Sequence, residues 1–273
     1  MEIPPEDLAN LTRVERTALA FASWINESPR ARTATHWINK NVHRHFVTLL
    51  TSRRIHLVGM DRMAALRPDR GVLIASNHRT YFDQYIIATY LYRHVVHWNQ
   101  FFFPVRSGFL YDTVPGILAN LLFSTMSMFP PIFRPRHKRG VTRAGLDFLA
   151  ERLKSPRALV GIHPEGTRNK NDDPYELLPA EPGFGRVVLH ARPIVIPIFV
   201  NGLSDSPAEE VRLNLRGRRP VIVVYGDPVD TSEFDGVDPR LFRNQVKVGR
   251  KVLDAVGRLG EIERRERERL TRA

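Results

Sequence analysis

The sequence contains no cysteine among its 273 residues. This absence excludes a thiol nucleophile, a disulfide framework, an iron–sulfur cluster and any zinc site built on thiolates. The G-x-S-x-G pattern of lipase-type serine nucleophiles is also missing. Any chemistry of this protein is therefore expected to use oxygen and nitrogen groups.

Long hydrophobic runs are scarce as well. The longest stretch without a charged residue, 113–133, has 21 residues, which is nominally long enough to span a bilayer. Prolines, a glycine and polar side chains interrupt it: Pro115, Gly116, Asn120, Ser124, Thr125, Ser127, Pro130 and Pro131. We interpret it as a buried or membrane-facing hairpin, and a transmembrane helix is the less favoured alternative.

Charge of one sign predominates instead. The 41 basic residues, of which 35 are arginine and 6 lysine, outnumber the 29 acidic ones and give a net charge of +12. The arginine fork matches phosphate and carboxylate, so this composition predicts anionic partners such as nucleic acid, phospholipid headgroups or phosphorylated cofactors. A G·C-rich genome would produce the same excess, and charge alone does not select the ligand.

The hydrophobic pattern divides the chain into three segments. Two amphipathic helices are expected at 6–26 and 35–51, and the second fits either a helix at a membrane surface or one packed on its own core. From Ile55 onward, short apolar runs alternate with helical stretches, which predicts an α/β fold with a mixed central sheet flanked by helices. We therefore expect an N-terminal helical segment (1–54), a candidate for membrane association, an α/β domain (55–235) and a charged C-terminal helix (236–273) packed on it.

The individual elements of the α/β domain follow from the same pattern. Strands are predicted at 55–58, 71–76, 101–105, 158–162, 194–200 and 221–225, and helices at 81–93, 117–126, 141–153, 184–191 and 239–270.

His78 and Asp83 lie between a predicted strand and a predicted helix. They are five residues apart, so their side chains can meet only across a bend, with His78 in the loop and Asp83 in the first helical turn. A carboxylate on one imidazole nitrogen fixes the tautomer and leaves the other nitrogen as a general base. Two plainer interpretations stay open: Thr80 and Asp83 form a capping-box pattern, and the same spacing recurs between His56 and Asp61, where no clear helix start follows.

A second polar segment, Gly161–Arg168, also leaves the end of a predicted strand. Loops after the ends of neighbouring strands converge on one crevice, so both segments are expected to face one site. Arg168 offers a phosphate fork, Gly166 lets backbone amides approach an anion, and Glu165 can accept a substrate hydroxyl or orient Arg168. An ordinary turn with a surface arginine is the alternative.

Two further patterns are set aside. Gly183-Phe184-Gly185 begins like a dinucleotide fingerprint, but Val188 stands at the third glycine position. His94 and His97 are spaced for a metal on one helical turn, yet no carboxylate cluster accompanies them, and we predict no metal site.

Taken together, the two polar segments resemble motifs of the glycerolipid acyltransferase superfamily, whose members transfer a fatty acyl group from a thioester to a hydroxyl on glycerol phosphate or a lysophospholipid. The similarity extends from about Val58 to Pro228. Four family blocks occur in order, the second being a looser fit: 77–83, 129–134, 164–168 and 194–198.

The resemblance implies a role for each matching residue. His78 would deprotonate the acceptor hydroxyl, and Asp83 would orient it. Arg168 and Arg134 would hold the acceptor's phosphate. The remaining substrate-binding residues would shape the acceptor pocket: Glu165, Gly166 and Thr167. The attack on the thioester would be direct, without an acyl-enzyme.

The resemblance also implies the partners. The donor would be acyl-CoA or acyl carrier protein, the acceptor a lysolipid or glycerol phosphate, and no cofactor would be bound. Phospholipid synthesis at an anionic membrane is the implied setting. A cytoplasmic, peripheral location is expected because the first seven residues lack the regions of a secretory signal. No specific nucleic acid is expected.

Two departures from the family leave the acceptor open. Members that acylate lysophosphatidic acid often carry a basic residue where Glu181 and Pro182 precede Gly183 here. A different lysolipid, a glycolipid or an amino-lipid therefore stays possible. His163 stands where the family often has an aromatic residue, and the sequence assigns it no role. A non-catalytic binder of nucleic acid or anionic membrane and a lipid hydrolase are the alternative functions.

Overall fold

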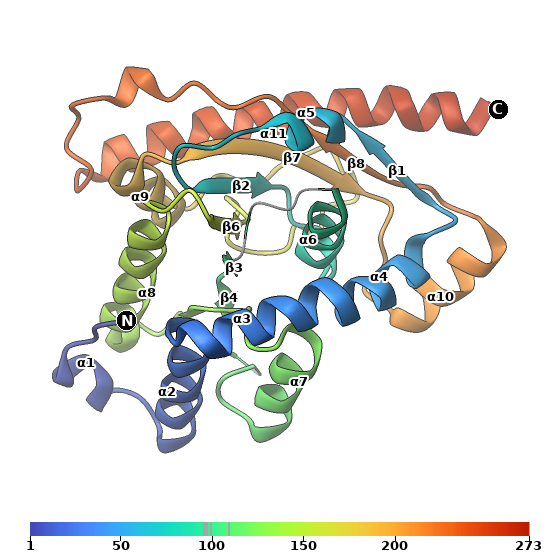
Figure 1. Ribbon diagram of the computed structural model, residues 1–273. Coiled ribbons are helices and arrows are strands. Elements are labelled where there is room, and N and C mark those ends of the chain that lie inside the picture. Colours follow the sequence, from blue (N-terminus) through green and yellow to red (C-terminus); the bar gives the residue numbers. More distant parts are fainter. Residues whose placement is uncertain (95–97, 99, 109, 273) are drawn as a thin grey trace.

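A computed structural model describes residues 1–94, 98, 100–108 and 110–272 (Figure 1). His97, which the sequence pairs with His94, lies outside the described residues.

Within the described residues, the central sheet has six strands in the order β1-β8-β7-β2-β6-β3, and only the β7–β8 pair is antiparallel. These strands are β1 (Ile55–Val58), β2 (Val72–Ser76), β3 (Gln100–Phe102), β6 (Ala158–Ile162), β7 (Ile194–Asn201) and β8 (Val221–Tyr225). The predicted mixed sheet flanked by helices is confirmed, and β1, β6 and β8 have the bounds that the sequence predicts. Near-continuous apolar runs form these strands because both faces of the sheet are covered.

Alternate residues of each strand supply two hydrophobic layers. Leu73 and Ala75 of β2 belong to one cluster with α8 (Arg139–Arg152), α9 (Pro182–Ala191) and α11 (Phe242–Arg272). Val72 and Ile74 belong to the other, with α5 (Met60–Ala65) and α6 (Asp83–His94). The sheet is therefore held between two helical layers, and its strand ends are free to carry loops.

The N-terminal helices differ from their predicted bounds. The first is divided into α1 (Pro5–Ala9) and α2 (Arg13–Glu27), because Thr12 and Glu15 form a capping box that starts a new helix. The second comprises α3 (Pro29–Ile38), a π-helical turn (Asn39–His43) and α4 (Arg44–Thr51), and it starts early because Ser28 caps it with proline in the first turn. Leu19 and Ala22 of α2 lie in the core, so this segment packs on the domain.

The sequence does not predict two of the helices, α5 and α10 (Pro207–Arg216). Gly59, in the left-handed region, leads directly into α5, so a helix does follow His56. Ser206 caps α10, which packs on α4. Its buried residues, Glu210 and Asn214, are polar while Val211 and Leu215 are exposed, so the apolar positions do not mark its packed face.

The predicted strand 101–105 is interrupted at Pro104, which has no N–H group to donate. β3 ends at Phe102, and a separate short strand, β4 (Val105–Arg106), pairs in parallel with β5 (Pro131–Ile132). The uncharged stretch 113–133 contains α7 (Val114–Ser124) and then the turn into β5. Across the described ranges, every helix is too short or too polar to cross a bilayer.

Candidate functional site

The two polar segments meet at one edge of the sheet. β2 and β6 are neighbouring parallel strands with Ala75 opposite Ile162, so the loops that follow them leave side by side. The Asn77 side chain fastens the first loop to the end of β7, because its amide donates to the Val200 carbonyl at 2.9 Å and its oxygen accepts from the Val200 amide at 2.8 Å. No role for Asn77 follows from the sequence motifs.

His78 and Asp83 are in contact across the bend. The distance from His78 Nδ1 to Asp83 Oδ2 is 3.1 Å. The same Oδ2 accepts backbone N–H bonds from Arg79 at 2.7 Å and Thr80 at 2.9 Å, while Oδ1 accepts the Thr80 hydroxyl at 2.7 Å. Asp83 is therefore both a helix-capping residue and the partner of the histidine, since one buried carboxylate starts α6 and contacts His78.

The charge state of Asp83 determines which nitrogen of His78 is free. Burial alone would raise the pKa of Asp83, but the hydrogen bond and charge of His78, with help from His163 and Thr80, outweigh it and lower the pKa. An ionised carboxylate only accepts hydrogen bonds, which assigns the proton to Nδ1 of His78. The lone pair of Nε2 can then act as a base.

His163 lies flat against His78. The ring centroids are 3.8 Å apart and the planes differ by 5°. Nδ1 of His163 is 3.1 Å from both the hydroxyl and the carbonyl oxygen of Ser76, so the ring is fixed from behind. Burial, and then the charge of His78, lower the pKa of His163 to about 3, which keeps it neutral. His163 thus serves as an aromatic surface that sets the plane of the His78 ring.

Glu165 joins the two loops. Its Oε1 accepts the backbone N–H of His78 at 2.8 Å, and its Oε2 accepts the backbone N–H of Leu178, also at 2.8 Å. Burial raises the pKa of this carboxyl despite both bonds. The expectation that Glu165 orients Arg168 is wrong, because both oxygens hold backbone amides instead.

Gly166 and Glu181 lie against each other. Gly166 has a φ of +61°, and a Cβ on it would come within 2.6 Å of Glu181 Cγ. Glu181 in turn donates its backbone N–H to the Pro164 carbonyl at 2.8 Å. The acidic residue noted in the sequence is therefore held beside the second loop.

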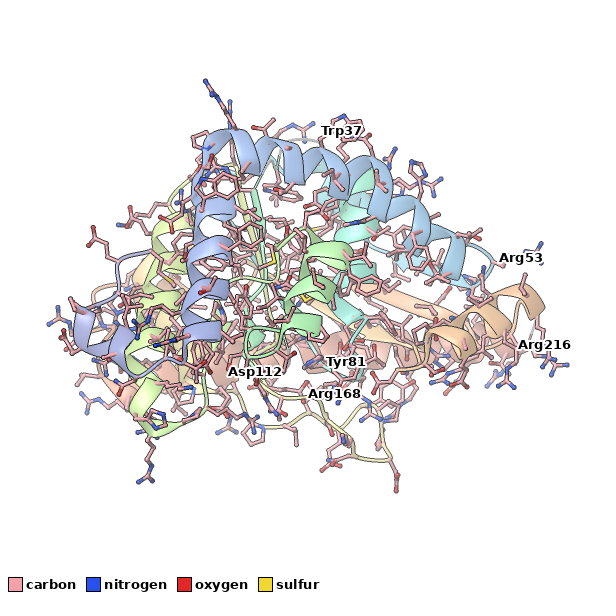
Figure 2. The ribbon with its side chains drawn as sticks, turned by 90° about the horizontal axis from the view of Figure 1, so that it is seen from below. Trp37, Arg53, Tyr81, Asp112, Arg168 and Arg216 are labelled. Atoms are coloured by element: carbon pink, nitrogen blue, oxygen red, sulfur yellow. The ribbon has the colours of Figure 1, made fainter. Side chains whose placement is uncertain are left out.

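Arg168 is ordered by two partners. Its guanidinium forms an ion pair with Asp205, donates to the Tyr81 hydroxyl at 2.8 Å and lies 3.6 Å above the Tyr81 ring (Figure 2). Asp205 also accepts the backbone N–H of Tyr81 at 2.9 Å. Asp205, which the sequence did not single out, thus fixes both members of this stacked pair.

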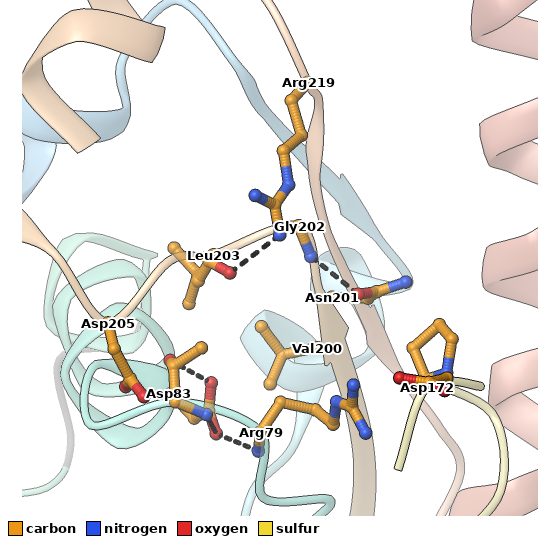
Figure 3. Close-up of a pocket in the computed structure, with 11 residues that line it drawn as sticks. Arg79, Asp83, Asp172, Val200, Asn201, Gly202, Leu203, Asp205 and Arg219 are labelled. Atoms are coloured by element: carbon orange, nitrogen blue, oxygen red, sulfur yellow. Dashed lines mark hydrogen bonds between the residues drawn. The ribbon is translucent and has the colours of Figure 1, made fainter. Parts of the chain in front are cut away.

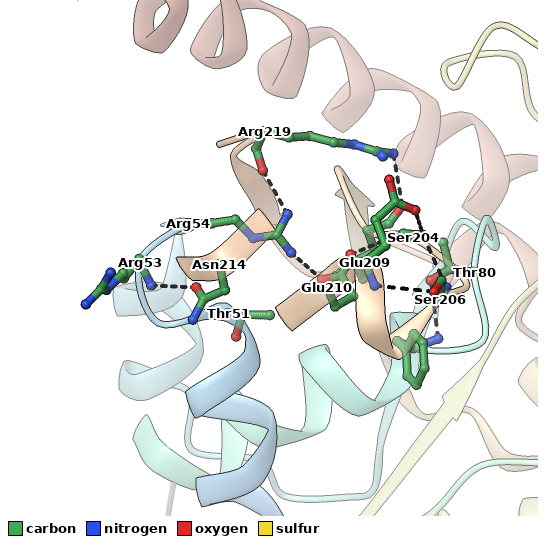
Figure 4. Close-up of polar contacts among 12 residues, drawn as sticks. Thr51, Arg53, Arg54, Thr80, Ser204, Ser206, Glu209, Glu210, Asn214 and Arg219 are labelled. Carbon is green, nitrogen blue, oxygen red and sulfur yellow. Dashed lines mark hydrogen bonds and ion pairs between the residues drawn. The ribbon is translucent and has the colours of Figure 1, made fainter. Parts of the chain in front are cut away.

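The loop that carries Asp205 is anchored by a buried network (Figure 4). Glu210 accepts the backbone N–H of Ser204 at 2.7 Å and forms an ion pair with Arg54, and both charged side chains are almost fully buried. Arg54 also donates to the Arg219 carbonyl at 3.1 Å. The network connects the beginning of β1 to α10 and to the loop before it.

Arg106 and Arg134 complete a group of three arginines. Arg106 donates to the Thr167 hydroxyl at 3.3 Å, so Thr167 is in contact with this group of arginines. Burial, followed by the positive charges of Arg134 and Arg168, lowers the pKa of Arg106. The β4–β5 pairing brings Arg106 opposite Ile132, two residues before Arg134. Such a concentration of guanidinium groups is suited to binding phosphate.

Comparison with protein families gives one match, to a family described as Acyltransferase, over residues 54–201. This is more than half of the chain. The chain belongs to the acyltransferase family. The family assignment from the sequence motifs is thereby confirmed, and the protein is an acyltransferase enzyme. The matched range includes both polar loops, β4 and β5. A search of the curated proteins finds no match.

The candidate site also contains three groups spaced for a metal ion, since one ligand atom each from His78, Asp83 and His163 lie within 4.8 Å of one another. The sequence predicts no metal here. Both Asp83 oxygens already accept bonds from Arg79 and Thr80, so the arrangement favours an acid–base pair over a ligand set.

Replacing His163 by phenylalanine should leave most of the acyltransferase activity, because a flat ring remains against His78. Replacing it by alanine should lower kcat further, since the His78 ring would lose its stacked neighbour, worth about 0.5–1.5 kcal/mol. Initial rates of both variants measure the difference. Equal losses in both would contradict the role of the ring face and point to the nitrogens.

Proposed function

We propose that this acyltransferase moves a fatty acyl group from acyl-CoA or acyl carrier protein to a hydroxyl of a glycerol-phosphate or lysophospholipid acceptor. The observation that carries the proposal is the position of the His78–Asp83 pair and the three arginines on the same pair of loops and the adjoining β4–β5 strands. The acceptor needs a base at its hydroxyl and cations at its phosphate. The two loops at this edge of the sheet and the adjoining β4–β5 pair would supply both.

In the proposed reaction, Nε2 of His78 takes the proton of the acceptor hydroxyl while the oxygen attacks the thioester carbonyl carbon. The tetrahedral intermediate expels the thiolate as the carbon–sulfur bond breaks, and the imidazolium returns the proton to sulfur. Asp83 stabilises the imidazolium between the two steps. Direct transfer agrees with the absence of cysteine, and no step requires a cofactor.

The phosphate of the acceptor would be held by Arg168, Arg106 and Arg134. Arg168 is paired with Asp205 in the free protein, and the phosphate would compete with this carboxylate for the guanidinium. A phosphate monoester such as glycerol phosphate carries about two negative charges near neutral pH, as phosphorylated side chains do, whereas the carboxylate carries one, which favours the exchange. Neutral acceptors lack this advantage.

Replacing Arg106 by glutamine should raise the KM for a phosphate-bearing acceptor by about tenfold, because hydrogen bonds to charged groups contribute about 1.5–3 kcal/mol. The KM for the acyl donor should change little. Steady-state kinetics with each substrate varied in turn measures both. Arg258→Gln removes the same charge from an exposed position of α11 and is the matched control. Equal changes in the two variants would show a general charge effect.

Apolar side chains exposed on the N-terminal helices and on α7 support a second part of the proposal (Figure 2). α7 contacts the π-helical turn between α3 and α4, so the two sets are close. Helices with one exposed apolar face bind at the headgroup level of bilayers. We propose peripheral attachment to the cytoplasmic face of an anionic membrane through these residues: Trp37, Val42, Phe46, Leu49, Val114, Leu118, Leu122 and Phe123.

The double replacement Leu118→Glu and Leu122→Glu should abolish sedimentation with vesicles that contain anionic phospholipid. Each leucine is more than half exposed, and burial of such a side chain contributes about 1.5–3 kcal/mol. Phe242→Glu with Val246→Glu, which adds the same charge to exposed apolar positions of α11, is the control and should sediment like the unmodified protein. Unchanged sedimentation of the α7 variant would rule out this attachment surface.

The proposed activity is tested by incubating the purified protein with labelled acyl-CoA or acyl carrier protein and a set of acceptors. Ester formation on glycerol phosphate or a lysophospholipid is expected. A glycolipid or amino-lipid as the best acceptor would overturn the acceptor assignment. Free fatty acid without an acceptor would indicate a hydrolase, and salt-sensitive polymer binding without any transfer would indicate a non-catalytic binder.

A further inference from the structure

A polar cavity of about 340 Å³ adjoins the back of Asp83 (Figure 3). It shares Thr80, Asp83 and Asp205 with the site described above, but His78 and Arg168 do not line it. Its volume is near the lower end of the range for small-molecule sites, about 300–1,000 Å³. The lining includes backbone and side chains from the start of α6, the end of β7 and the loop after it, with Arg79 and Arg219 entering from two sides.

Arg79 has no assigned role and an unsatisfied donor. Its Nη1 is buried and, among the described residues, has no hydrogen-bond partner. A buried polar atom without a partner is unfavourable, and a charged one more so. The Arg79 guanidinium therefore needs an acceptor that the protein does not supply.

The carboxylates around the cavity are largely engaged elsewhere. Asp83 accepts bonds from His78 and Thr80, and Asp205 pairs with Arg168. Arg219 donates to the Leu203 carbonyl, a neutral partner. Asp172 lines the cavity with the two guanidinium groups and forms no ion pair within the described part of the chain. The acceptor missing at Arg79 Nη1, and not a surplus of positive charge, therefore favours an anion.

We propose that this cavity binds a small phosphate-bearing anion between Arg79 and Arg219. Guanidinium forks match phosphate oxygens in pairs, and the anion would supply the acceptor missing at Nη1. The ligand would be inorganic phosphate or a small phosphate monoester. The backbone N–H of Arg79 donates to Asp83 at 2.7 Å, so the bound anion would lie one residue from the His78–Asp83 pair. The proposal does not depend on acyl transfer.

Calorimetric titration with inorganic phosphate, and separately with glycerol phosphate, tests the proposal. All proteins carry Arg106→Gln, which weakens the other phosphate site and leaves the Arg168–Asp205 pair intact. Adding Arg79→Gln should weaken phosphate binding by about tenfold or more. Adding Arg79→Lys, which keeps the charge without the fork, should weaken it less. Tighter binding of glycerol phosphate would identify a monoester as the ligand, and equal or weaker binding would identify the free anion.

Asp172→Asn should have the opposite effect on phosphate affinity. Removing the carboxylate that lines the cavity with both guanidinium groups should tighten phosphate binding by about two- to fivefold. Weaker binding in Asp172→Asn would contradict the proposal, because Asp172 would then be part of the ligand site or of its support. Equal phosphate affinity with and without Arg79→Gln, in proteins that unfold at the same temperature, would overturn it.

Discussion

Replacing His78 by alanine should lower kcat by about 10² to 10⁴ while the protein stays folded, because the variant loses the base that takes the acceptor's proton. The fold should persist since the side chain is partly exposed and the contact with Glu165 uses the backbone N–H of His78, which alanine keeps. Rates of labelled ester formation at saturating substrates, with circular dichroism as the folding check, measure both effects.

His56→Ala is the matched control for this prediction. His56 lies at the same spacing from Asp61 as His78 does from Asp83, but it belongs to β1 at the edge of the sheet. Its removal should leave kcat nearly unchanged. Full activity in His78→Ala would exclude the proposed base, and a comparable loss in His56→Ala would show that the effect comes from damage to the fold.

Replacing Glu210 by alanine should lower the free energy of unfolding by about 3–5 kcal/mol. Arg54 and Glu210 are 1% and 3% exposed, and the variant would leave the arginine buried without its anion. Burial raises the pKa of Glu210 and lowers that of Arg54, so each charge depends on the other. Urea denaturation followed by fluorescence gives the change in unfolding free energy.

A double replacement separates the effect of the unpaired charge from the effect of lost side-chain packing. Arg54→Met with Glu210→Leu removes both charges and should recover much of the loss, because no unpaired ion remains. The exposed pair between Arg62 and Asp227 is the reference, and Asp227→Ala should cost less than about 1 kcal/mol. A loss of similar size in Asp227→Ala and Glu210→Ala would show that burial of the ion pair is unimportant.

The sequence predicted the part of the site that local geometry determines. A strand, a bend and a helix start bring His78 to Asp83 within six residues, and the parallel neighbours β2 and β6 bring Glu165 alongside. Both relations follow from strand ends and helix caps, which composition and periodicity reveal. The roles of the individual residues in the reaction stay predictions.

The residues that the sequence did not reveal depend on long-range contacts. Arg106 is positioned by the β4–β5 pairing. Asp205 accepts the backbone N–H of Tyr81, although the two residues are 124 positions apart in the sequence. Arg54 and Glu210 are 156 positions apart. No periodic pattern marks such pairs, because each depends on how separate elements pack.

The contacts of Asp83 determine at which stage the His78 ring becomes oriented. One of the Asp83 oxygens accepts the amides that begin α6 and also contacts His78. The proposed base, His78, is therefore oriented by the same contacts that begin the helix. Every molecule with an intact α6 already holds its imidazole in position, and substrate binding has no rearrangement of this pair left to drive.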